Sequence, residues 1–208
     1  MITFLGIEIE TGPEALVPRA ETELLGRLAI EKLANGTRAI DVCCGTGNLA
    51  CAIATAAPHA TLWALDLTDG CVALARRNVT RLGLADRVTV VQGDLFAALP
   101  DGVAPVDLIV CNPPYISTTK LATRDDLAGE PREAFDGGPY GVTIHQRVAR
   151  DALALLRPGG WLTFEFGLGQ ERQLELVIGR TKGYDLIELR TDETGAPRAI
   201  AARKKETP

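Results

Sequence analysis

The chain has 208 residues, of which 46% are hydrophobic and 24% charged, and its formal net charge at pH 7 is −5. This balance excludes an intrinsically disordered chain and is typical of a globular domain with a sizeable core. Proteins that bind phosphate backbones nonspecifically need a broad basic surface. Because this chain is acidic, we expect no nucleic-acid partner.

The longest apolar run, Leu49 to Ala57, is shorter than the roughly 18–20 residues that cross a bilayer, so we expect no membrane partner. The chain starts with MITFLGIEIE, which contains Glu8 and Glu10 but no basic residue, unlike a secretory signal. Five cysteines without a CxxC pair, and two histidines, predict neither a disulfide framework nor a zinc site. We therefore expect a cytoplasmic protein with buried, reduced thiols and no metal.

From about residue 20 the sequence predicts alternating helices and strands. Helical spacing of apolar residues predicts helices over 20–34, 48–57, 69–82, 141–156 and 170–181. Short apolar or β-branched runs predict strands over 38–42, 61–65, 87–91, 106–111 and 161–166, and 158–160 reads as a turn. The last two strands, 184–190 and 198–202, predict an antiparallel hairpin. This order predicts an α/β fold: a mostly parallel sheet with helices on both faces and an antiparallel hairpin at its C-terminal edge.

Two segments fall outside this alternation. Residues 4–10, followed by Gly12 and Pro13, predict a small strand or hairpin. We therefore expect an N-terminal extension (1–19) followed by one α/β domain (20–208). Residues 117–140 are polar and irregular, and a long irregular loop in a compact domain is typical of a functional segment.

Three motifs follow the first three predicted strands of the domain. Gly45 and Gly47 let the backbone turn tightly and approach a ligand, and the helix that follows offers unpaired N–H groups. Asp66 ends the next strand, where a carboxylate can bind both hydroxyls of a ribose. Asp94 and Leu95 end the third strand, where they can lie near an adenine ring. Because these strand ends share one edge of a parallel sheet, they predict a site for a nucleoside-bearing cofactor, either a nicotinamide dinucleotide or S-adenosylmethionine.

The fourth strand ends in Asn112-Pro113-Pro114-Tyr115. The two prolines remove two N–H donors, so the backbone there presents mainly carbonyl oxygens. The Asn112 side-chain oxygen and the Pro113 carbonyl can accept both hydrogens of a planar –NH2 group and aim its nitrogen at an electrophile. Tyr115 can stack on a flat amide and attract a nearby sulfonium. The motif therefore favours N-methyl transfer from S-adenosylmethionine over hydride transfer.

With these motifs the sequence resembles the class I S-adenosylmethionine-dependent methyltransferases. It resembles most closely the catalytic domain of the HemK/PrmC family, protein glutamine N5-methyltransferases that act on peptide-chain release factors. The resemblance runs from about residue 4 to 204, and its motifs are 17–23 (VPRAETE), 41–47, Asp66, 112–116 (NPPYI), Glu130-Pro131, 137–138, 158–160 and 165–167 (EFG). It implies a Rossmann-like fold, S-adenosylmethionine as cofactor and a release factor as protein partner.

The resemblance also implies which residues hold each ligand. The cofactor-binding residues would be Asp41, Cys43, Gly45, Thr46, Gly47, Asp66, Leu67, Asp94, Leu95 and Asn112. The substrate-binding residues would be Arg19, Asn112, Pro113, Pro114 and Tyr115, and the catalytic ones Asn112, Pro113 and Tyr115.

The sequence departs from the family pattern at three points, of which the second and third bear on the substrate. Cys43 stands where the family has a glycine, and Tyr140 stands where it has an aspartate. We also expect no N-terminal helical domain of the kind that helps bacterial members dock the release factor. A small-molecule N-methyltransferase of specialised metabolism is therefore the alternative, followed by methylation of a flipped nucleic-acid base and by a binding module without catalysis. His145 is expected to be a packed histidine rather than a general base.

Overall fold

The computed structural model describes residues 1–34, 36–124 and 131–206. The strands of its main sheet are β3 (Arg38–Val42), β4 (Thr61–Asp66), β5 (Val88–Gln92), β6 (Val106–Cys111), β7 (Leu156–Glu165), β8 (Tyr184–Thr191) and β9 (Pro197–Lys204). The α-helices are α1 (Ala20–Glu31), α2 (Asn48–Ala56), α3 (Asp69–Arg81), α4 (Thr118–Leu121), α5 (Thr143–Leu155) and α6 (Glu171–Thr181). A short 3-10 helix spans Arg132–Ala134.

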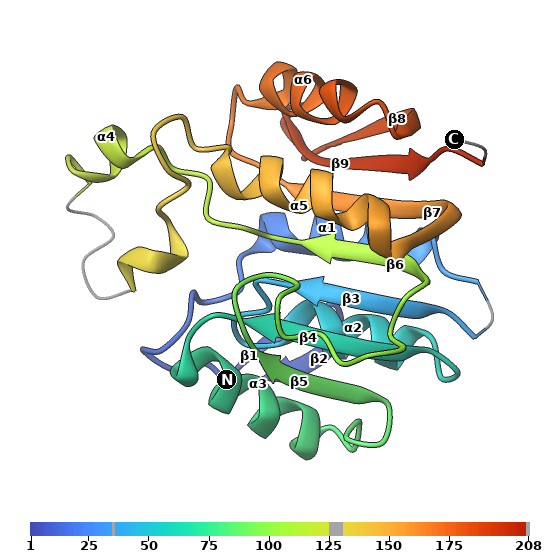
Figure 1. Ribbon diagram of the computed structural model, residues 1–208. Coiled ribbons are helices and arrows are strands. Elements are labelled where there is room, and N and C mark those ends of the chain that lie inside the picture. Colours follow the sequence, from blue (N-terminus) through green and yellow to red (C-terminus); the bar gives the residue numbers. More distant parts are fainter. Residues whose placement is uncertain (35, 125–130, 207–208) are drawn as a thin grey trace.

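The seven strands lie in the order β5-β4-β3-β6-β7-β9-β8 (Figure 1). The strands from β5 to β7 are parallel, and β9 is antiparallel to both of its neighbours, β7 and β8. The predicted α/β fold with a C-terminal antiparallel hairpin is therefore confirmed. Within that hairpin the last strand of the chain lies inside the sheet, and β8 forms the edge.

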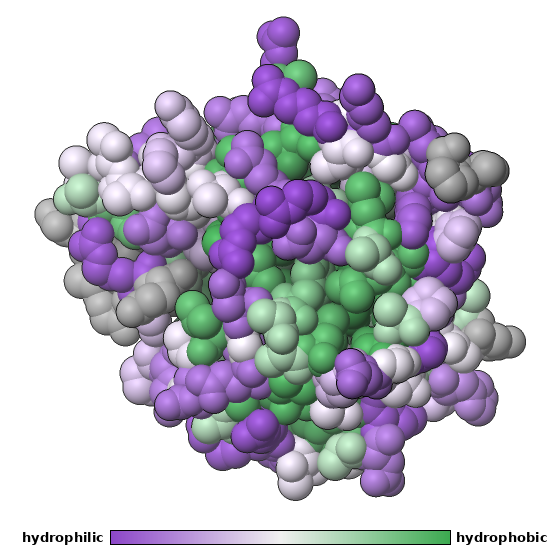
Figure 2. Space-filling model, in the orientation of Figure 1, coloured by the Kyte–Doolittle hydropathy of each residue, from purple (hydrophilic) through white to green (hydrophobic). Residues whose placement is uncertain are grey.

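Alternate residues of each strand enter two separate cores, because side chains alternate across a sheet. In β4, Leu62 packs with α1, α2 and α3, whereas Leu65 packs on the face covered by α5 and α6. On this second face the segment 93–105 lies over part of the sheet, and Leu95 and Val103 from it are buried there (Figure 1). Figure 2 shows hydrophobic residues gathered in the middle of the face in view, framed by hydrophilic ones. In the described part of the chain, no helix is long and apolar enough to span a bilayer.

The N-terminal residues form an antiparallel hairpin of β1 (Ile2–Phe4) and β2 (Ile7–Ile9), as predicted. The turn between them, residues 5–6, has positive φ at both positions, which suits the right-handed twist of a hairpin. Phe4 and Ile9 are buried in the core beneath α1 and α2, so the hairpin packs on the helical layer and is a sheet of its own.

The strand predicted over 161–166 is longer than expected. β7 starts at Leu156 and includes residues 158–160, which were predicted to form a turn. Gly159 has a φ of +73°, and the register between β7 and β6 shifts near this point. The prediction of a turn was wrong because the glycines and the proline form an irregularity inside a strand that continues on both sides of them.

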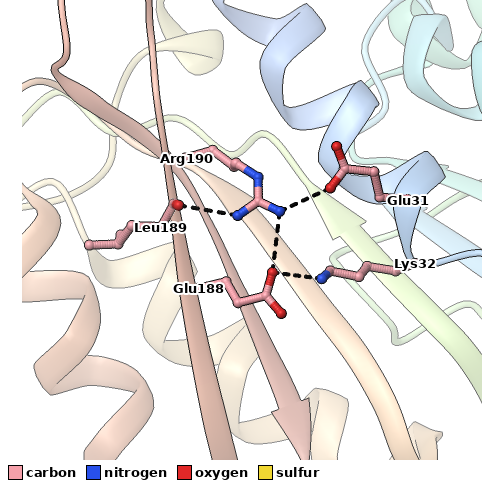
Figure 3. Close-up of polar contacts among 5 residues, drawn as sticks. All are labelled: Glu31, Lys32, Glu188, Leu189 and Arg190. Atoms are coloured by element: carbon pink, nitrogen blue, oxygen red, sulfur yellow. Dashed lines mark hydrogen bonds and ion pairs between the residues drawn. The ribbon is translucent and has the colours of Figure 1, made fainter.

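Charged side chains connect the end of α1 to the edge strand β8 (Figure 3). Lys32 Nζ lies 2.7 Å from Glu188 Oε2, and Arg190 Nη2 lies 2.9 Å from Glu31 Oε2 and 3.4 Å from Glu188 Oε2. Lys32 Nζ also lies 4.1 Å from the centre of the Trp161 ring, which adds a cation–π contact. Glu188 is thus held between two cations, and α1 is fixed against the C-terminal half of the sheet.

Candidate active site

A cavity of about 380 Å³ lies at the carboxyl ends of β3, β4, β5 and β6. Each of these four strands leads into a residue of its wall: Cys43, Asp66, Gly93 and Asn112. Open α/β sheets bind their ligands at this edge. The predicted site residues that line the cavity are Cys43, Gly45, Thr46, Asp66, Leu67, Asp94, Leu95, Asn112 and Pro114.

Two predicted cofactor-binding residues lie behind the cavity wall instead. Asp41 is fully buried, and its Oδ2 accepts a hydrogen bond of 3.0 Å from the Ala50 N–H near the start of α2. Gly47 precedes α2 with a φ of +75°, and a Cβ atom there would lie 3.1 Å from Ala75 Cβ. Both residues therefore shape the turn that carries Gly45 and Thr46 without lining the cavity.

The predicted substrate residues are also divided between the wall and its surroundings. Asn112 and Pro114 line the cavity, whereas Pro113 and Tyr115 do not. Arg19 is exposed at the residue before α1 and is not among the lining residues. Of the motif that follows β6, Asn112 is therefore the polar side chain in position to meet a ligand.

The turn after β3 presents bare backbone to the cavity. Gly45 has a φ of +54°, and a Cβ atom built there would meet nothing within 4 Å. Its N–H donates a hydrogen bond of 2.9 Å to Asp66 Oδ2, which joins the ends of β3 and β4. Cys43 also adopts a left-handed conformation (φ +59°), in which a glycine is less strained. This explains why the family pattern has glycine at that position.

One buried asparagine, which the sequence prediction missed, connects this turn to the N-terminal hairpin. Asn78 of α3 accepts the Glu10 N–H at 2.7 Å and donates to the Glu10 carbonyl at 2.9 Å and the Thr46 carbonyl at 3.0 Å. Its Oδ1 also accepts a hydrogen bond of 3.2 Å from Arg81 Nη2, so both donors and both acceptor positions of this buried amide are engaged. No local pattern around Asn78 indicates this role, because its partners are far away in the sequence.

Residues 14–18 supply a further wall, since Glu14, Leu16 and Pro18 line the cavity. Of these, Pro18 lies in a motif that the family resemblance places near the site, whereas Glu14 and Leu16 were not predicted. The Cys71 thiol donates to the Glu14 carbonyl at 3.3 Å. A Cβ atom at Gly70 would lie 2.8 Å from Glu14 Cβ, so a glycine lets this segment pass close to the start of α3. The part of the chain before α1 therefore belongs to the site.

The residues around Asn112 form a buried polar cluster. Asn112 Nδ2 donates to Thr22 Oγ1 at 3.2 Å, and the Tyr115 hydroxyl donates to Glu165 Oε1 at 3.3 Å. Burial raises the pKa of Tyr115 to about 12, so this hydroxyl keeps its proton. Burial raises the pKa of Glu165 to about 6, against the stabilising effects of Thr22, Arg198 and Tyr115. Glu165 and Thr22 were not predicted as site residues, although both lie in motifs of the family resemblance.

His145 is a packed histidine, as expected. It is fully buried in α5, with Nε2 2.9 Å from the Glu165 carbonyl oxygen and its ring 5.0 Å from that of Phe164. Burial lowers its pKa to about 4. The five cysteines are free thiols, and all except Cys43 are buried.

The irregular segment 117–140 contributes to the cavity in part. Pro131, Ala134 and Asp136 line it, whereas Glu130 lies outside the described residues. Tyr140 is 78% exposed and is not a lining residue, so this departure from the family pattern lies outside the cavity wall.

Asp41 gives the cofactor-free protein a specific pH dependence. Burial raises its pKa from 3.8 to about 8, and its Oδ1 has no hydrogen-bond partner among the described residues. Between these values the folded protein holds a proton that the unfolded chain has released, so the free energy of unfolding falls as the pH rises from about 4 to 8. Over this pH range the free energy of unfolding of Asp41→Asn should fall by a few kcal/mol less than that of the wild type. Each unit of pKa shift corresponds to about 1.4 kcal/mol.

Urea unfolding of both proteins at pH 5 and pH 8 measures this difference. Asp101→Asn changes an exposed carboxylate and serves as the control. An equal pH dependence in wild type and Asp41→Asn would show that Asp41 is ionised in the folded protein.

The cavity fits S-adenosylmethionine, the cofactor that the resemblance implies. Asp66 and Asp94 offer carboxylates to the hydroxyl and amino donors of an adenosine, and Leu95 and Ile144 offer apolar surface to its ring. The open space above Gly45 allows a ligand to approach the backbone closely. The donor set and the shape therefore agree with a charged nucleoside.

Comparison with known proteins identifies the family. The chain matches the family described as Methyltransferase small domain over residues 19–130. It is 36% identical to the release factor glutamine methyltransferase of Geobacter sulfurreducens, over 96% of this chain and 69% of that protein. It is 34% identical to the enzyme of the same name from Moorella thermoacetica, over 98% of this chain and 72% of that protein. A shorter match, 43% identical over 64% of this chain and 42% of that protein, is to the ribosomal protein uL3 glutamine methyltransferase of Bradyrhizobium diazoefficiens.

Solved structures agree on the fold. A methyltransferase from Pyrococcus furiosus is 20% identical with a TM-score of 0.67, over 96% of this chain and 90% of that chain. The catalytic domain of hMettl16 is 19% identical with a TM-score of 0.73, over 98% of this chain and 77% of that chain. With the cavity at the expected edge of the sheet, these findings show that the chain is an S-adenosylmethionine-dependent methyltransferase of class I and belongs to the release factor glutamine methyltransferase (HemK/PrmC) family.

Proposed function

We propose that this enzyme methylates the side-chain nitrogen of a glutamine in a peptide chain release factor. The observation that carries the proposal is the position of Asn112, which lines the cofactor cavity at the start of an Asn-Pro-Pro-Tyr segment with few N–H donors. The release factor glutamine methyltransferases that resemble this chain align with nearly all of it, which supports the same acceptor.

In this proposal, residues at the ends of different strands bind different parts of the cofactor. Asp66 would accept the ribose hydroxyls, Asp94 and Leu95 would hold the adenine, and the turn with Gly45 and Thr46 would bind the amino-acid portion. The other residues of the cofactor set would be Cys43, Leu67 and Asn112 in the wall, with Asp41 and Gly47 behind it. S-adenosylmethionine supplies a methyl group bonded to a positively charged sulfur.

The chain must orient a poor nucleophile, because the lone pair of an amide nitrogen is delocalised into its carbonyl. Asn112 Oδ1 and the Pro113 carbonyl would accept the two hydrogens of the glutamine –NH2 and stabilise the positive charge that grows on nitrogen. Pro114 would supply an apolar wall, and Arg19, which follows the lining residue Pro18, would approach the substrate from outside that wall. After transfer, the positively charged amide nitrogen is acidic enough to lose its proton to water, so His145 is not needed as a base.

Transfer of a labelled methyl group tests the acceptor. Wild-type enzyme is incubated with labelled S-adenosylmethionine and a full-length release factor, or the same factor with the glutamine of its Gly-Gly-Gln sequence replaced by glutamate. We expect label in the first protein and none in the second. Label found only in ribosomal protein uL3, or only in small amides, would overturn the proposal.

A further inference from the structure

The side chain of Asn112 must present one particular end to the cavity. Its amide has a donor end (Nδ2) and an acceptor end (Oδ1) of nearly the same shape, so packing alone distinguishes them poorly. The proposed function needs the acceptor end toward the substrate nitrogen. In the structure, Nδ2 donates a hydrogen bond of 3.2 Å to Thr22 Oγ1, which leaves Oδ1 available to the substrate.

The hydroxyl of Thr22 explains this orientation. Thr22 is 2% exposed, and its hydroxyl lies close enough to the carboxyl group of Glu165 to lower the pKa of that group. An ionised carboxylate only accepts hydrogen bonds, so the single hydroxyl proton of Thr22 must point to Glu165. The Thr22 oxygen is then left as an acceptor toward Asn112, which must turn Nδ2 to it.

Glu165 also holds the other end of the same segment. Its Oε1 accepts the Tyr115 hydroxyl at 3.3 Å, while the Tyr115 carbonyl accepts a hydrogen bond of 3.0 Å from Gln170 Nε2. Glu165 is 2% exposed, and its Oε2 has no hydrogen-bond partner among the described residues. One buried carboxylate at the end of β7 is thus in contact with both Thr22 and Tyr115.

We propose that Glu165 is a positioning residue: through Thr22 it orients the Asn112 amide with Oδ1 toward the cavity, and through Tyr115 it holds the segment in place. The proposal rests on the proposed function, because it assigns a purpose to the acceptor end of Asn112. Neither Glu165 nor Tyr115 lines the cavity, so neither is assigned contact with the substrate.

This relay depends on the charge of Glu165, whose pKa is raised to about 6 by burial. Glu21 of α1 and Arg198 of β9 also act on this carboxyl, with opposite signs, and Tyr115 and Thr22 are its hydrogen-bond partners. His145 of α5 binds the backbone of Glu165 and, with its pKa lowered to about 4, stays neutral near pH 6. Below about pH 6 a protonated Glu165 can donate a hydrogen bond to Thr22 Oγ1. Thr22 can then donate its own proton to Asn112, so the Asn112 amide is no longer held with Nδ2 toward Thr22.

A matched pair of variants at Thr22 tests the relay. Thr22→Val keeps the shape but removes the hydroxyl, whereas Thr22→Ser keeps the hydroxyl. We expect kcat with the release factor to fall about 10-fold in Thr22→Val and to stay within about threefold in Thr22→Ser, with KM for S-adenosylmethionine unchanged in both. The control is Thr163→Val, which removes a buried hydroxyl in β7 that donates to the Ile109 carbonyl. This variant should leave kcat unchanged.

A second readout does not depend on the acceptor. The side-chain amide NMR signals of Asn112, assigned by their loss in Asn112→Ala, should shift with an apparent pKa near 6 in wild type. The Asn112 signals should no longer shift with pH in Thr22→Val or in Glu165→Gln. If Thr22→Val does not fold, the titration of Glu165→Gln tests the relay. Signals that ignore pH in wild type, or an unchanged kcat in folded Thr22→Val, would overturn the proposal. If wild type methylates no release factor, the proposed function fails, and the NMR titration still tests the relay.

Discussion

Asn112→Ala should lower turnover by about 10²–10³-fold, the usual cost of removing one preorganised hydrogen-bonding group from a reacting centre. The variant loses the side-chain oxygen that would hold the acceptor –NH2, while the carbonyls of the following prolines remain. Asn112 lines the cavity together with many other residues, so the affinity for S-adenosylmethionine should change by no more than about threefold. Single-turnover methyl transfer and calorimetric titration with the cofactor measure the two quantities separately.

The control for this variant is Gln92→Ala. Gln92 ends β5 at the same edge of the sheet, and its exposed amide donates to the Leu67 carbonyl at 3.3 Å. Its loss should leave turnover near the wild-type value. If Asn112→Ala also turns over at a near wild-type rate with normal cofactor binding, the assignment of Asn112 as the amide-binding group is wrong.

Gly141→Ala should abolish most of the activity, with a loss of about 100-fold or more, because the glycine lies against the substrate-binding segment. A Cβ atom at Gly141 would lie 2.4 Å from the Tyr115 carbonyl oxygen and 2.8 Å from Gln170 Nε2. These two atoms are hydrogen-bonded to each other at 3.0 Å. The new methyl group must therefore displace Tyr115, and a shift of 1 Å at a reacting centre can cost about 10²-fold in rate.

Gly195→Ala separates this close approach from backbone strain. Gly141 and Gly195 both have a positive φ, +71° and +83°, but a Cβ atom at Gly195 meets nothing within 4 Å. Each alanine should cost about 1–2 kcal/mol of stability for its left-handed conformation. At about 2–4 °C per kcal/mol for a chain of this size, thermal unfolding should show a moderate fall in Tm for Gly195→Ala and a larger one for Gly141→Ala. Equal losses of Tm and of activity in both variants would contradict the role given to the close approach.

The sequence predicted the regular part of the fold well because its signals are local. β3 and β6 have the predicted bounds, since each is a short apolar run with turn-forming or polar residues at its ends. α1 ends at Glu31 rather than at 34, where Thr37 accepts the Ala34 N–H in a turn of its own. The start of β7 was missed because proline and glycine normally indicate a turn, whereas here residues 157–160 form a bulge between two paired parts of one strand.

The site was predicted where motifs follow strand ends and missed where contacts are distant in the sequence. The glycine turn, Asp66 and Asn112 meet in one cavity because parallel strands place their carboxyl ends together. By contrast, Thr22 meets Asn112 across 90 residues, and Tyr115 meets Glu165 across 50. A carboxylate at the end of an otherwise apolar strand was the available signal for Glu165, and its partners emerge only from the tertiary structure.

The charges that connect β8 to α1 also bear on self-association. β8 is an edge strand, and an edge strand with free backbone groups can pair with the edge of another molecule. Glu188 and Arg190 are engaged with Glu31 and Lys32 at the end of α1, which packs on one face of the sheet. A foreign strand added here would have to bury these charges or break their contacts. The same cluster that anchors the helix therefore disfavours aggregation through growth of the sheet.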